Sequence, residues 1–385
     1  MADLRKSLLG LHSKRSGLSG AANQNFTPIK WSEYFDKEEK IETARGKFHV
    51  YSKGNEGPIL LCLHGGGYSG LTWALFAVEI SNLIHCQVVA VDGRGHGHTN
   101  TENDYDLSLD TLAKDIIDIA EIILEEKNAP IILMGHSMGG AVAVEAAYHI
   151  NAVKGLCVID VVEGTALDAL SSMQSILRGR PSHFKTIKVV KLITWKRQGM
   201  KTGKLAADEC DNIDFQNIEL SSSSHRELVA SSYTLTEVAE EGEDKDEVDK
   251  CSDCGKPPLP KSQRTEVFKT PNSHKTEDDG PQYAWRIDLS KTESFWTGWF
   301  KGLSQKFLDI RIPKLLLLAN IHGLDTTLTV GQMQGKFQMQ VLARSGHAIH
   351  EDQPHNVAEI VAGHLIKQKL TEPKSAYVHS SMPAC

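Results

Sequence analysis

The chain has 385 residues, of which 40% are hydrophobic and 24% charged, so it can bury one large core with insertions or two to three smaller ones. Its formal net charge of −7 gives no general attraction to phosphate backbones or anionic lipid, which disfavours nucleic-acid and membrane-surface roles. The basic, Ser-rich first twenty residues lack an apolar run of signal-peptide length, and no other stretch is apolar enough for a membrane span. We therefore expect a soluble protein that is not secreted.

The seven cysteines are an odd number thinly spread through the chain, and three lie inside apolar strand-like runs. This usage predicts reduced thiols and a cytoplasmic or nuclear location. Cys251 and Cys254 form a CxxC pair, but no second pair or nearby histidine pair completes a set of four ligands. The sequence therefore predicts no metal site.

Residues 1–45 contain few apolar side chains and predict a disordered N-terminal arm. From Phe48, short apolar runs alternate with segments of helical periodicity, which is typical of an α/β fold with a mostly parallel sheet and helices on both faces. A helix capped by Ser108 is expected from the apolar residues that recur at helical spacing between Leu109 and Ile123. The expected strands are 48–52, 58–63, 87–92, 130–134, 154–160, 313–319 and 337–342.

Residues 204–282 break this alternation with a serine run, an acidic run and a stretch rich in Pro and Lys, and predict a disordered low-complexity insertion. Beyond it, aromatic residues at helical spacing between 295 and 307 predict a helix that packs a cap onto the sheet or roofs a substrate cleft. The expected divisions are 46–203 for the first part of the core with the start of the cap, 283–372 for the end of the cap and the second part of the core, and 373–385 for a C-terminal tail.

The strongest chemical signal is the G-H-S-M-G motif at 135–139, which follows an apolar strand and precedes a small-residue helix start. A G-x-S-x-G turn in this setting predicts that Ser137 is a nucleophile lifted out of the backbone. Upstream, strand 58–63 leads into an H-G-G-G loop, where the backbone N–H groups of Gly66 and Gly67, with that of Met138, predict an oxyanion hole. A phosphate-binding loop is the weaker interpretation, because the G-K-[ST] ending is missing.

A general base is expected on a loop after the last strand, and His347 follows strand 337–342, with His350 as its rival. The orienting acid can come from either of two strand ends. Asp325 follows strand 313–319, at the position that most proteins of this fold use. Asp160 ends a buried strand, where an unpaired carboxylate would be costly and therefore needs a partner such as an imidazolium. These two choices stay nearly equal on the residues alone.

The chain closely resembles the protein phosphatase methylesterase family of α/β-hydrolases, which removes the methyl ester from the C-terminal leucine of the phosphatase 2A catalytic subunit. The likeness extends from about Pro28 to Pro373, excluding the acidic insertion. It is carried by the segments 63–69 (L-H-G-G-G-Y-S), 135–140 (G-H-S-M-G-G), 157–166 (C-V-I-D-V-V-E-G-T-A), 173–174 (M-Q), 178–181 (R-G-R-P), 283–286 (Y-A-W-R), 298–300 (G-W-F), 313–319 (P-K-L-L-L-L-A), 331–341 (G-Q-M-Q-G-K-F-Q-M-Q-V) and 346–352 (G-H-A-I-H-E-D).

Carried over by position, the family's nucleophile falls on Ser137, its base on His347 and its acid on Asp160, so the resemblance favours Asp160 over Asp325. It implies a protein substrate, with the phosphatase 2A catalytic subunit and its core dimer as partners. The chemistry of these three residues calls for no metal or organic cofactor, and we expect none. The residues expected to bind the substrate tail are His64, Tyr68, Gln334 and Met339.

The sequence departs from the family pattern at Tyr68, where a histidine is expected, and in the turn at 92–97. Both are expected to line the active face, and Arg94 to Gly97 is interpreted as structural support for the site. Two alternative functions stay open: a small-molecule carboxylesterase that uses the same three residues, and a mainly non-catalytic partner that holds phosphatase 2A in an inactive form.

Overall fold

The computed structural model describes residues 29–179, 183–184, 283–284, 289–320 and 324–374. The predicted insertion at 204–282 lies outside the described residues, as do Cys251, Cys254, the first 28 residues and the last eleven. Of the helices in the described ranges, none is long and apolar enough to cross a membrane.

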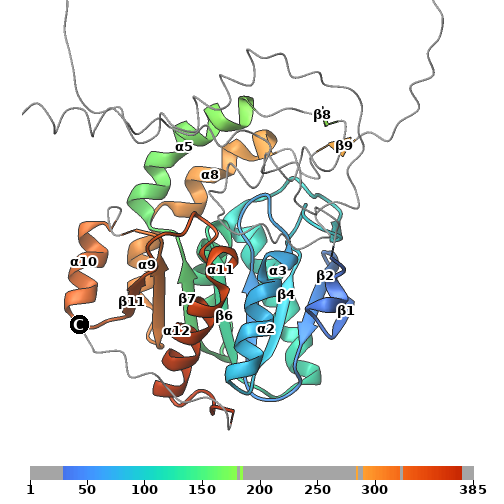
Figure 1. The fold of residues 1–385 in the computed structure, drawn as a ribbon. Helices are drawn as coiled ribbons and strands as arrows, with labels where there is room; N and C mark the ends of the chain where they lie inside the picture. Colours follow the sequence, from blue (N-terminus) through green and yellow to red (C-terminus); the bar gives the residue numbers. More distant parts are fainter. Residues whose placement is uncertain (1–28, 180–182, 185–282, 285–288, 321–323, 375–385) are drawn as a thin grey trace, which may run out of the picture. The chain divides into compact units, whose positions relative to one another are not determined.

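Nine strands of the described chain form one central sheet, in the order β1-β2-β4-β3-β6-β7-β10-β11, with β5 paired to β2 (Figure 1). Pairing is parallel from β4 to β11, whereas β1, β2 and β5 pair antiparallel at one side. All seven predicted strands are present. The strand bounds are β1 (Lys37–Thr43), β2 (Gly46–Lys53), β3 (Ile59–Leu63), β4 (Gln87–Val91), β5 (Asn100–Thr101), β6 (Ile131–His136), β7 (Val153–Ile159), β10 (Lys314–Leu318) and β11 (Gln338–Val341).

The predicted disordered arm at 1–45 is wrong for its last part, because β1 pairs with β2 over its whole length. Five of the seven residues of β1 are Lys or Glu, so the strand has no apolar run that the sequence could show. Main-chain hydrogen bonds hold it at the sheet edge, where charged side chains face water. Phe35, just before it, is buried in the core.

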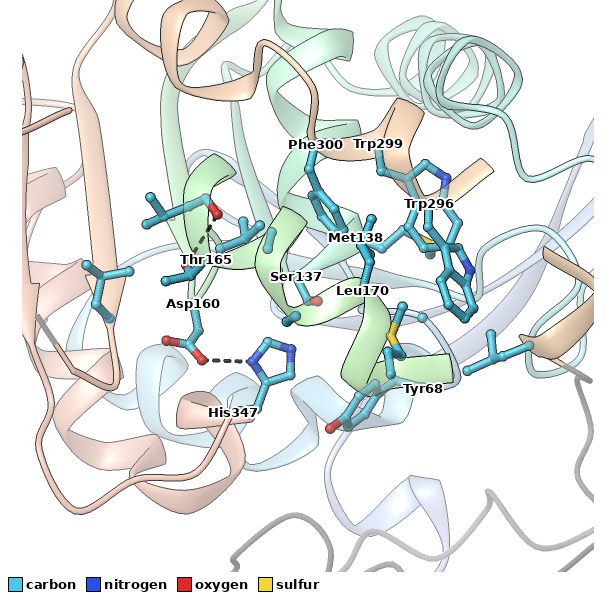
Figure 2. A pocket seen from close by; sticks show the side chains of 18 of the residues that line it. Tyr68, Ser137, Met138, Asp160, Thr165, Leu170, Trp296, Trp299, Phe300 and His347 are labelled. Carbon is cyan, nitrogen blue, oxygen red and sulfur yellow. Dashed lines mark hydrogen bonds and ion pairs between the residues drawn. The ribbon is translucent and has the colours of Figure 1, made fainter. Parts of the chain in front are cut away.

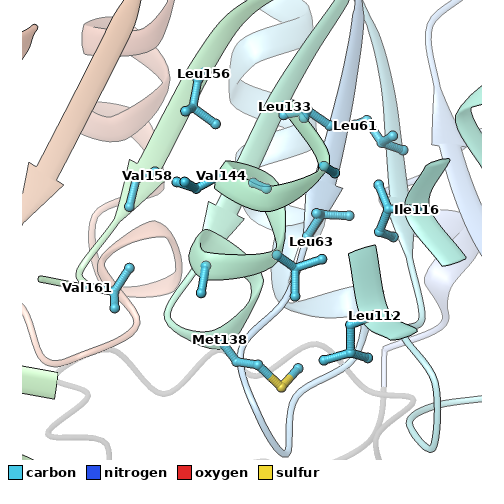
Figure 3. Close-up of a cluster of buried hydrophobic side chains, with 14 of the residues drawn as sticks. Leu61, Leu63, Leu112, Ile116, Leu133, Met138, Val144, Leu156, Val158 and Val161 are labelled. Carbon is cyan, nitrogen blue, oxygen red and sulfur yellow. The ribbon is translucent and has the colours of Figure 1, made fainter. Parts of the chain in front are cut away.

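Both faces of the central strands are buried, which explains their continuous apolar runs. Along β3, Leu61 and Leu63 point into one hydrophobic cluster, while Leu60 and Cys62 point into another on the opposite face. Figure 3 shows the first cluster between the sheet and helices α3 and α4. Helices α8 and α9 add side chains to the same cluster, and α2 and α12 cover the other face. The helix bounds are α2 (Ala74–Leu83), α3 (Leu109–Glu126), α4 (Met138–Ala147), α5 (Glu163–Arg178), α8 (Glu293–Phe300), α9 (Leu303–Asp309), α10 (Thr326–Met333), α11 (Ile349–Asp352) and α12 (Pro354–Lys367), with short 3₁₀ turns η2 (Trp31–Glu33), η3 (Gly70–Trp73) and η5 (Leu289–Thr292).

Helix α3 begins directly after Ser108, as the sequence predicts, and buries its apolar stripe. The side chain of Ser108 makes no capping hydrogen bond, however, so that detail of the prediction is wrong. The N–H of Ser108 is instead bonded to Asp106 Oδ1 at 3.2 Å, which fixes the turn that enters the helix.

The aromatic segment predicted as one helix at 295–307 forms two helices, α8 and α9, separated at Gly302. Gly302 has φ +78°, a left-handed conformation that ends the regular spiral. The carboxylate of Glu163, at the start of α5, accepts hydrogen bonds from the N–H groups of Gly302 (2.8 Å) and Ser304 (3.1 Å). These two hydrogen bonds therefore link α5 to the junction of α8 and α9.

The described parts of the cap lie between β7 and β10 in the sequence, at the predicted position. Helices α5 and α8 lie beyond the carboxyl ends of the central strands, beside one another (Figure 1). Two short strands, β8 (His183–Phe184) and β9 (Tyr283–Ala284), pair antiparallel, with His183 opposite Ala284. Residues 183–184 and 283–284, about a hundred positions apart in the sequence, are therefore adjacent in space.

The turn after β4 is anchored by a buried ion pair. Arg94 holds Asp115 of α3 through two bonds, Nε to Oδ2 at 2.8 Å and Nη2 to Oδ1 at 2.7 Å. Its remaining nitrogen, Nη1, donates to the Thr101 hydroxyl and the Asn103 carbonyl, both at 3.0 Å. This agrees with the structural support that the sequence predicts for the turn at 94–97.

We predict that Asp115→Ala lowers the free energy of unfolding by about 3 kcal/mol, because it leaves the Arg94 guanidinium buried without its carboxylate. Urea denaturation measures the change. The matched control is Asp110→Ala on the exposed side of the same helix, which should change stability by less than about 1 kcal/mol. Equal losses in the two variants would contradict the role assigned to the ion pair.

Candidate active site

Ser137 stands on a sharp turn between β6 and α4, with φ 52° and ψ −120°. This conformation is costly for a residue with a side chain and is typical of functional positions. The turn closes because Gly135 and Gly139 carry no Cβ: one at Gly135 would overlap the Gly139 carbonyl, and one at Gly139 the Leu63 carbonyl. The hydroxyl of Ser137 is thereby presented beyond the end of β6.

Asp160 follows β7, the strand next to β6, and also has a positive φ, 51°. Its N–H donates to the Leu317 carbonyl at 2.8 Å, and its Oδ1 accepts from the N–H of Ala319 at 2.9 Å. These bonds to β10 and the residue after it fix the direction of the carboxylate. The second oxygen, Oδ2, is left for the site.

His347 lies on the loop after β11, and its Nδ1 is 2.8 Å from Asp160 Oδ2. Because the ionised carboxylate accepts only, Nδ1 carries the hydrogen and Nε2 is the nitrogen left to act as a base. In Figure 2 the hydroxyl of Ser137 lies on the side of the imidazole away from Asp160, and all three residues line one cavity. The structure therefore brings together the three residues that the resemblance selects.

The two rival residues have other partners. Asp325 caps helix α10, with Oδ1 accepting from the N–H of Leu328 at 2.8 Å and Oδ2 from the hydroxyl of Ser304. His350 is fully buried, with Nε2 3.0 Å from the Thr72 hydroxyl and its ring stacked on Trp73. Neither residue lines the cavity that holds Ser137.

The H-G-G-G loop is held by two buried histidines. His64 Nδ1 donates to the Gly65 carbonyl at 2.7 Å and its Nε2 accepts from the N–H of Gly93 at 2.9 Å. His96 Nδ1 donates to the Arg94 carbonyl at 2.8 Å, so its Nε2 accepts from the N–H of Gly67 at 2.9 Å. His64 thus supports the loop and does not line the cavity, contrary to its predicted substrate-binding role.

Of the three predicted oxyanion donors, Met138 and Gly66 line the cavity and Gly67 does not. The left-handed backbone at Gly67, with φ +81°, directs its N–H to His96, so this donor is already engaged. Met138 is the first residue of α4, and the N–H groups of a helix's first turn have no partner within the helix. Met138 and Gly66 remain the proposed donors.

The cavity has a volume of about 360 Å³ and lies between the strand ends and the cap. Tyr68 is on its wall, as predicted, whereas Gln334 is exposed at the end of α10 and Met339 packs on the core from β11. Those two predicted residues do not reach the cavity, because β11 lies beyond β10 at the edge of the sheet. The lining residues are Gly66, Tyr68, Ser137, Met138, Asp160, Val161, Val162, Thr165, Ala166, Ala169, Leu170, Met173, Leu289, Trp296, Trp299, Phe300, Leu318, Asn320 and His347.

One wall of the cavity is apolar and comes from the cap. Trp296 and Phe300 of α8 both pack in the core and line the cavity, so the two roles suggested by the sequence coexist. The facing residues Ala166, Leu170 and Met173 of α5 were not predicted. Their i, i+4, i+7 spacing directly after the strand that ends in Asp160 is the signal that could have found them.

Two buried, neutral histidines, His136 and His350, lie near His347. Burial, with the nearby charge of His347, lowers the pKa of His136 well below its ordinary value and that of His350 to about 3. Their rings lie 4.7 Å apart, and that of His136 lies 4.6 Å from that of His347. His136 and His350 therefore stay neutral across the neutral pH range.

Residues 60–220 match the model of the alpha/beta hydrolase family. The chain is 43% identical to protein phosphatase methylesterase 1 of Mus musculus, over 94% of this chain and 90% of that protein. It is 40% identical to the probable protein phosphatase methylesterase 1 of Caenorhabditis elegans, over 91% of this chain and 80% of that protein. The chain belongs to the protein phosphatase methylesterase family.

Solved structures of other proteins share the predicted α/β-hydrolase fold with this chain. E-2-(acetamidomethylene)succinate hydrolase superposes with a TM-score of 0.56 at 18% identity, covering 86% of this chain and 99% of the other. An esterase of M. tuberculosis gives a TM-score of 0.51 at 18% identity, over 91% and 96%. At such identities the likeness concerns the fold alone. As a member of the methylesterase family, the protein is a carboxylic ester hydrolase.

We predict that Asp160→Asn lowers the kcat for p-nitrophenyl acetate about a thousandfold or more, because the amide no longer favours the His347 tautomer with hydrogen on Nδ1. Asn tolerates a positive φ, so the fold should survive. Asp325→Asn is the matched control: its oxygen can still cap α10, and kcat should stay within about threefold of wild type. The reverse order of effects would identify Asp325 as the acid.

We also predict that part of this enzyme's stability is lost as the pH falls below about 6.5, the ordinary histidine pKa in an unfolded chain. His350 stays neutral in the folded state down to a pKa of about 3, so below pH 6.5 the unfolded chain binds the extra proton. Each such histidine contributes a slope of about 1.4 kcal/mol per pH unit between those values.

Urea unfolding of wild type and His350→Phe between pH 5 and 8 measures the contribution of His350. The Phe ring keeps the stack on Trp73 but cannot bind a proton. Below pH 6.5, the variant's free energy of unfolding should therefore fall less steeply than that of wild type, by about 1.4 kcal/mol per pH unit. Parallel curves for the two proteins would show that His350 is not the source.

Proposed function

We propose that this protein removes the methyl ester from the carboxymethylated C-terminal leucine of the protein phosphatase 2A catalytic subunit and releases methanol. The observation that carries the proposal is the 2.8 Å pairing of His347 with Asp160 in the cavity that also holds Ser137. It occurs in a chain whose relatives are named protein phosphatase methylesterase 1.

In the first half of the reaction, His347 Nε2 takes the proton of the Ser137 hydroxyl as the oxygen attacks the ester carbonyl carbon. The negative charge that develops on the carbonyl oxygen is stabilised by the N–H groups of Met138 and Gly66. Each donor of this kind is worth roughly a hundredfold in rate. His347 then gives its proton to the departing methoxide, so methanol leaves and the acyl group stays on Ser137.

In the second half, His347 removes a proton from water, which attacks the acyl–Ser137 carbonyl through the same stabilised oxyanion. The bond to Ser137 Oγ breaks, the oxygen regains its proton from His347, and the free carboxylate leaves. Asp160 stabilises the imidazolium in both halves, from a side chain that is 17% exposed and held by the Ala319 N–H. The mechanism calls for no metal or organic cofactor.

The cavity suits a leucine ester. Its cap wall of Leu170, Met173, Trp296 and Phe300 offers apolar surface for the branched side chain. Methanol is a small leaving group and needs little room beside His347.

The remainder of the substrate is a protein tail and requires a partner surface. We propose the phosphatase 2A catalytic subunit and its core dimer as this partner. Unpaired Cys62, Cys86 and Cys157 support the reducing cytoplasm or nucleus as the place of reaction.

The same apolar wall would accept a small ester without any protein attached, so a small-molecule carboxylesterase is the second candidate. A mainly non-catalytic hold on inactive phosphatase 2A is less well supported, because the Asp160–His347 pair and the strained Ser137 turn are both maintained. A methylated phosphatase separates these alternatives from the methylesterase, because only the methylesterase removes the methyl group and loses that activity with Ser137→Ala.

We predict that wild-type protein removes one methyl group, about 14 Da, from a phosphatase 2A core dimer carboxymethylated on its C-terminal leucine, and that Ser137→Ala removes none. Intact-mass spectrometry of the catalytic subunit measures the change. Wild type should also hydrolyse p-nitrophenyl acetate, and Ser137→Ala should not. Retention of the methyl group with wild type that still cleaves the small ester would sink the protein-substrate proposal and favour the small-molecule esterase.

A further inference from the structure

His136 is the last residue of β6 and directly precedes Ser137 in the chain. Its side chain is fully buried, and the mechanism above does not use it. Its ring nevertheless reaches the base: Nε2 lies 2.9 Å from the backbone carbonyl oxygen of His347, 211 residues further along the chain. One histidine thus links the strand that carries the nucleophile to the loop that carries the base.

The chemistry of this contact fixes the state of the ring. A carbonyl oxygen can only accept, so His136 Nε2 carries the hydrogen and donates it to His347. Nδ1 is buried and has no hydrogen-bond partner among the described residues. Burial and the charges of His347 and His350 hold the pKa of His136 well below its ordinary value, so the ring stays a neutral donor when His347 takes up a proton.

Packing leaves the ring of His136 little freedom to turn. The ring of Tyr68 meets it edge-on at 5.3 Å, and those of His347 and His350 lie at 4.6 and 4.7 Å. A Cβ at Gly65 would come within 2.9 Å of His136 Nδ1, so the H-G-G-G loop fits beside the ring because residue 65 is glycine. The ring therefore contacts the loop of the proposed donor Gly66 as well as the loop of the base.

The unpaired Nδ1 argues against simple space filling. A buried polar atom without a partner costs about 1–3 kcal/mol, which an apolar side chain of similar size would avoid. The hydrogen bond from Nε2 is what a histidine offers here and a phenylalanine or leucine does not. His347 itself is 49% exposed on its side chain, so burial alone does not hold the base in position.

We propose that His136 is a positioning residue, which holds the backbone of His347 at a fixed distance from Ser137 through the Nε2–H bond to the His347 carbonyl. Because His136 is covalently next to Ser137, any shift of the nucleophile turn is carried to the base. Asp160 fixes the orientation of the imidazole, and His136 fixes the position of the residue that bears it. The inference rests on the proposed Ser137–His347 chemistry but on no particular ester.

The test compares His136→Gln with His136→Met, two side chains of similar length and volume that differ in the amide donor. With p-nitrophenyl acetate, Gln should keep kcat within about threefold of wild type, because its amide can reach the His347 carbonyl. Met should lose about ten- to a hundredfold in kcat, as expected for a misplaced catalytic group, with KM changed less than about twofold. If the Met variant does not fold, His136→Phe replaces it.

His364→Met controls for the loss of a buried histidine as such. His364 is buried in α12, outside the cavity, and makes one hydrogen bond, from Nδ1 to Gln338 Oε1 at 3.1 Å. It should lower the melting temperature about as much as His136→Met and leave kcat unchanged. Equal kcat for the Gln and Met variants, or an equal loss in the His364 control, would overturn the positioning role.

Failure of this inference differs from failure of the proposed function. If wild type hydrolyses p-nitrophenyl acetate but leaves the methylated phosphatase unchanged, the protein-substrate proposal fails and the Gln and Met comparison still decides the role of His136. If wild type demethylates the phosphatase and the two variants do so at equal rates, the proposed function stands and the positioning role is wrong.

Discussion

The site depends on the backbone turn at Ser137. A chain that leaves a buried parallel strand and enters a helix within one residue must reverse direction in little space. The positive φ of Ser137, 52°, achieves this reversal. The energy stored there is offset by its surroundings: β6 is hydrogen-bonded on both sides, α4 is buried, and two glycines make room for the crossing carbonyls. These contacts fix the backbone at Ser137.

The same principle recurs one strand away. Asp160 directly follows β7 with a positive φ; its N–H donates to the Leu317 carbonyl, and one carboxylate oxygen accepts from the N–H of Ala319. Because β6, β7 and β10 are parallel neighbours, their carboxyl ends lie at one edge of the sheet, so Ser137 and Asp160 lie at the same edge without a long connection. The cap then supplies an apolar wall over this edge and excludes water from part of it.

Histidines around the site differ in function because they differ in partners. His64 and His96 each donate to a carbonyl from Nδ1 and accept a backbone N–H at Nε2, which fixes the glycine loop. His136 donates to a carbonyl from Nε2, and His347 donates to a carboxylate from Nδ1. Of these four histidines, His347 is the one that pairs with a carboxylate. Its side chain is half exposed and lines the cavity, which leaves Nε2 available for proton transfer. Burial keeps His64 and His136 neutral by lowering their pKa values.

The sequence by itself determined the seven core strands, the Ser137 turn and the loop of His347, because short-range patterns of apolar runs and glycines specify buried strands and their tight connections. It left Asp160 and Asp325 equal, since both follow strands of the same sheet; tertiary contacts gave Asp325 to a helix cap and Asp160 to His347. Strand β1 was not predicted, because backbone hydrogen bonds to β2 hold it in the sheet and its sequence has no apolar run. The engagement of Gly67 by His96 and the bond from His136 to His347 join residues 29 and 211 positions apart, and such contacts exist only once the sheet has brought its loops together.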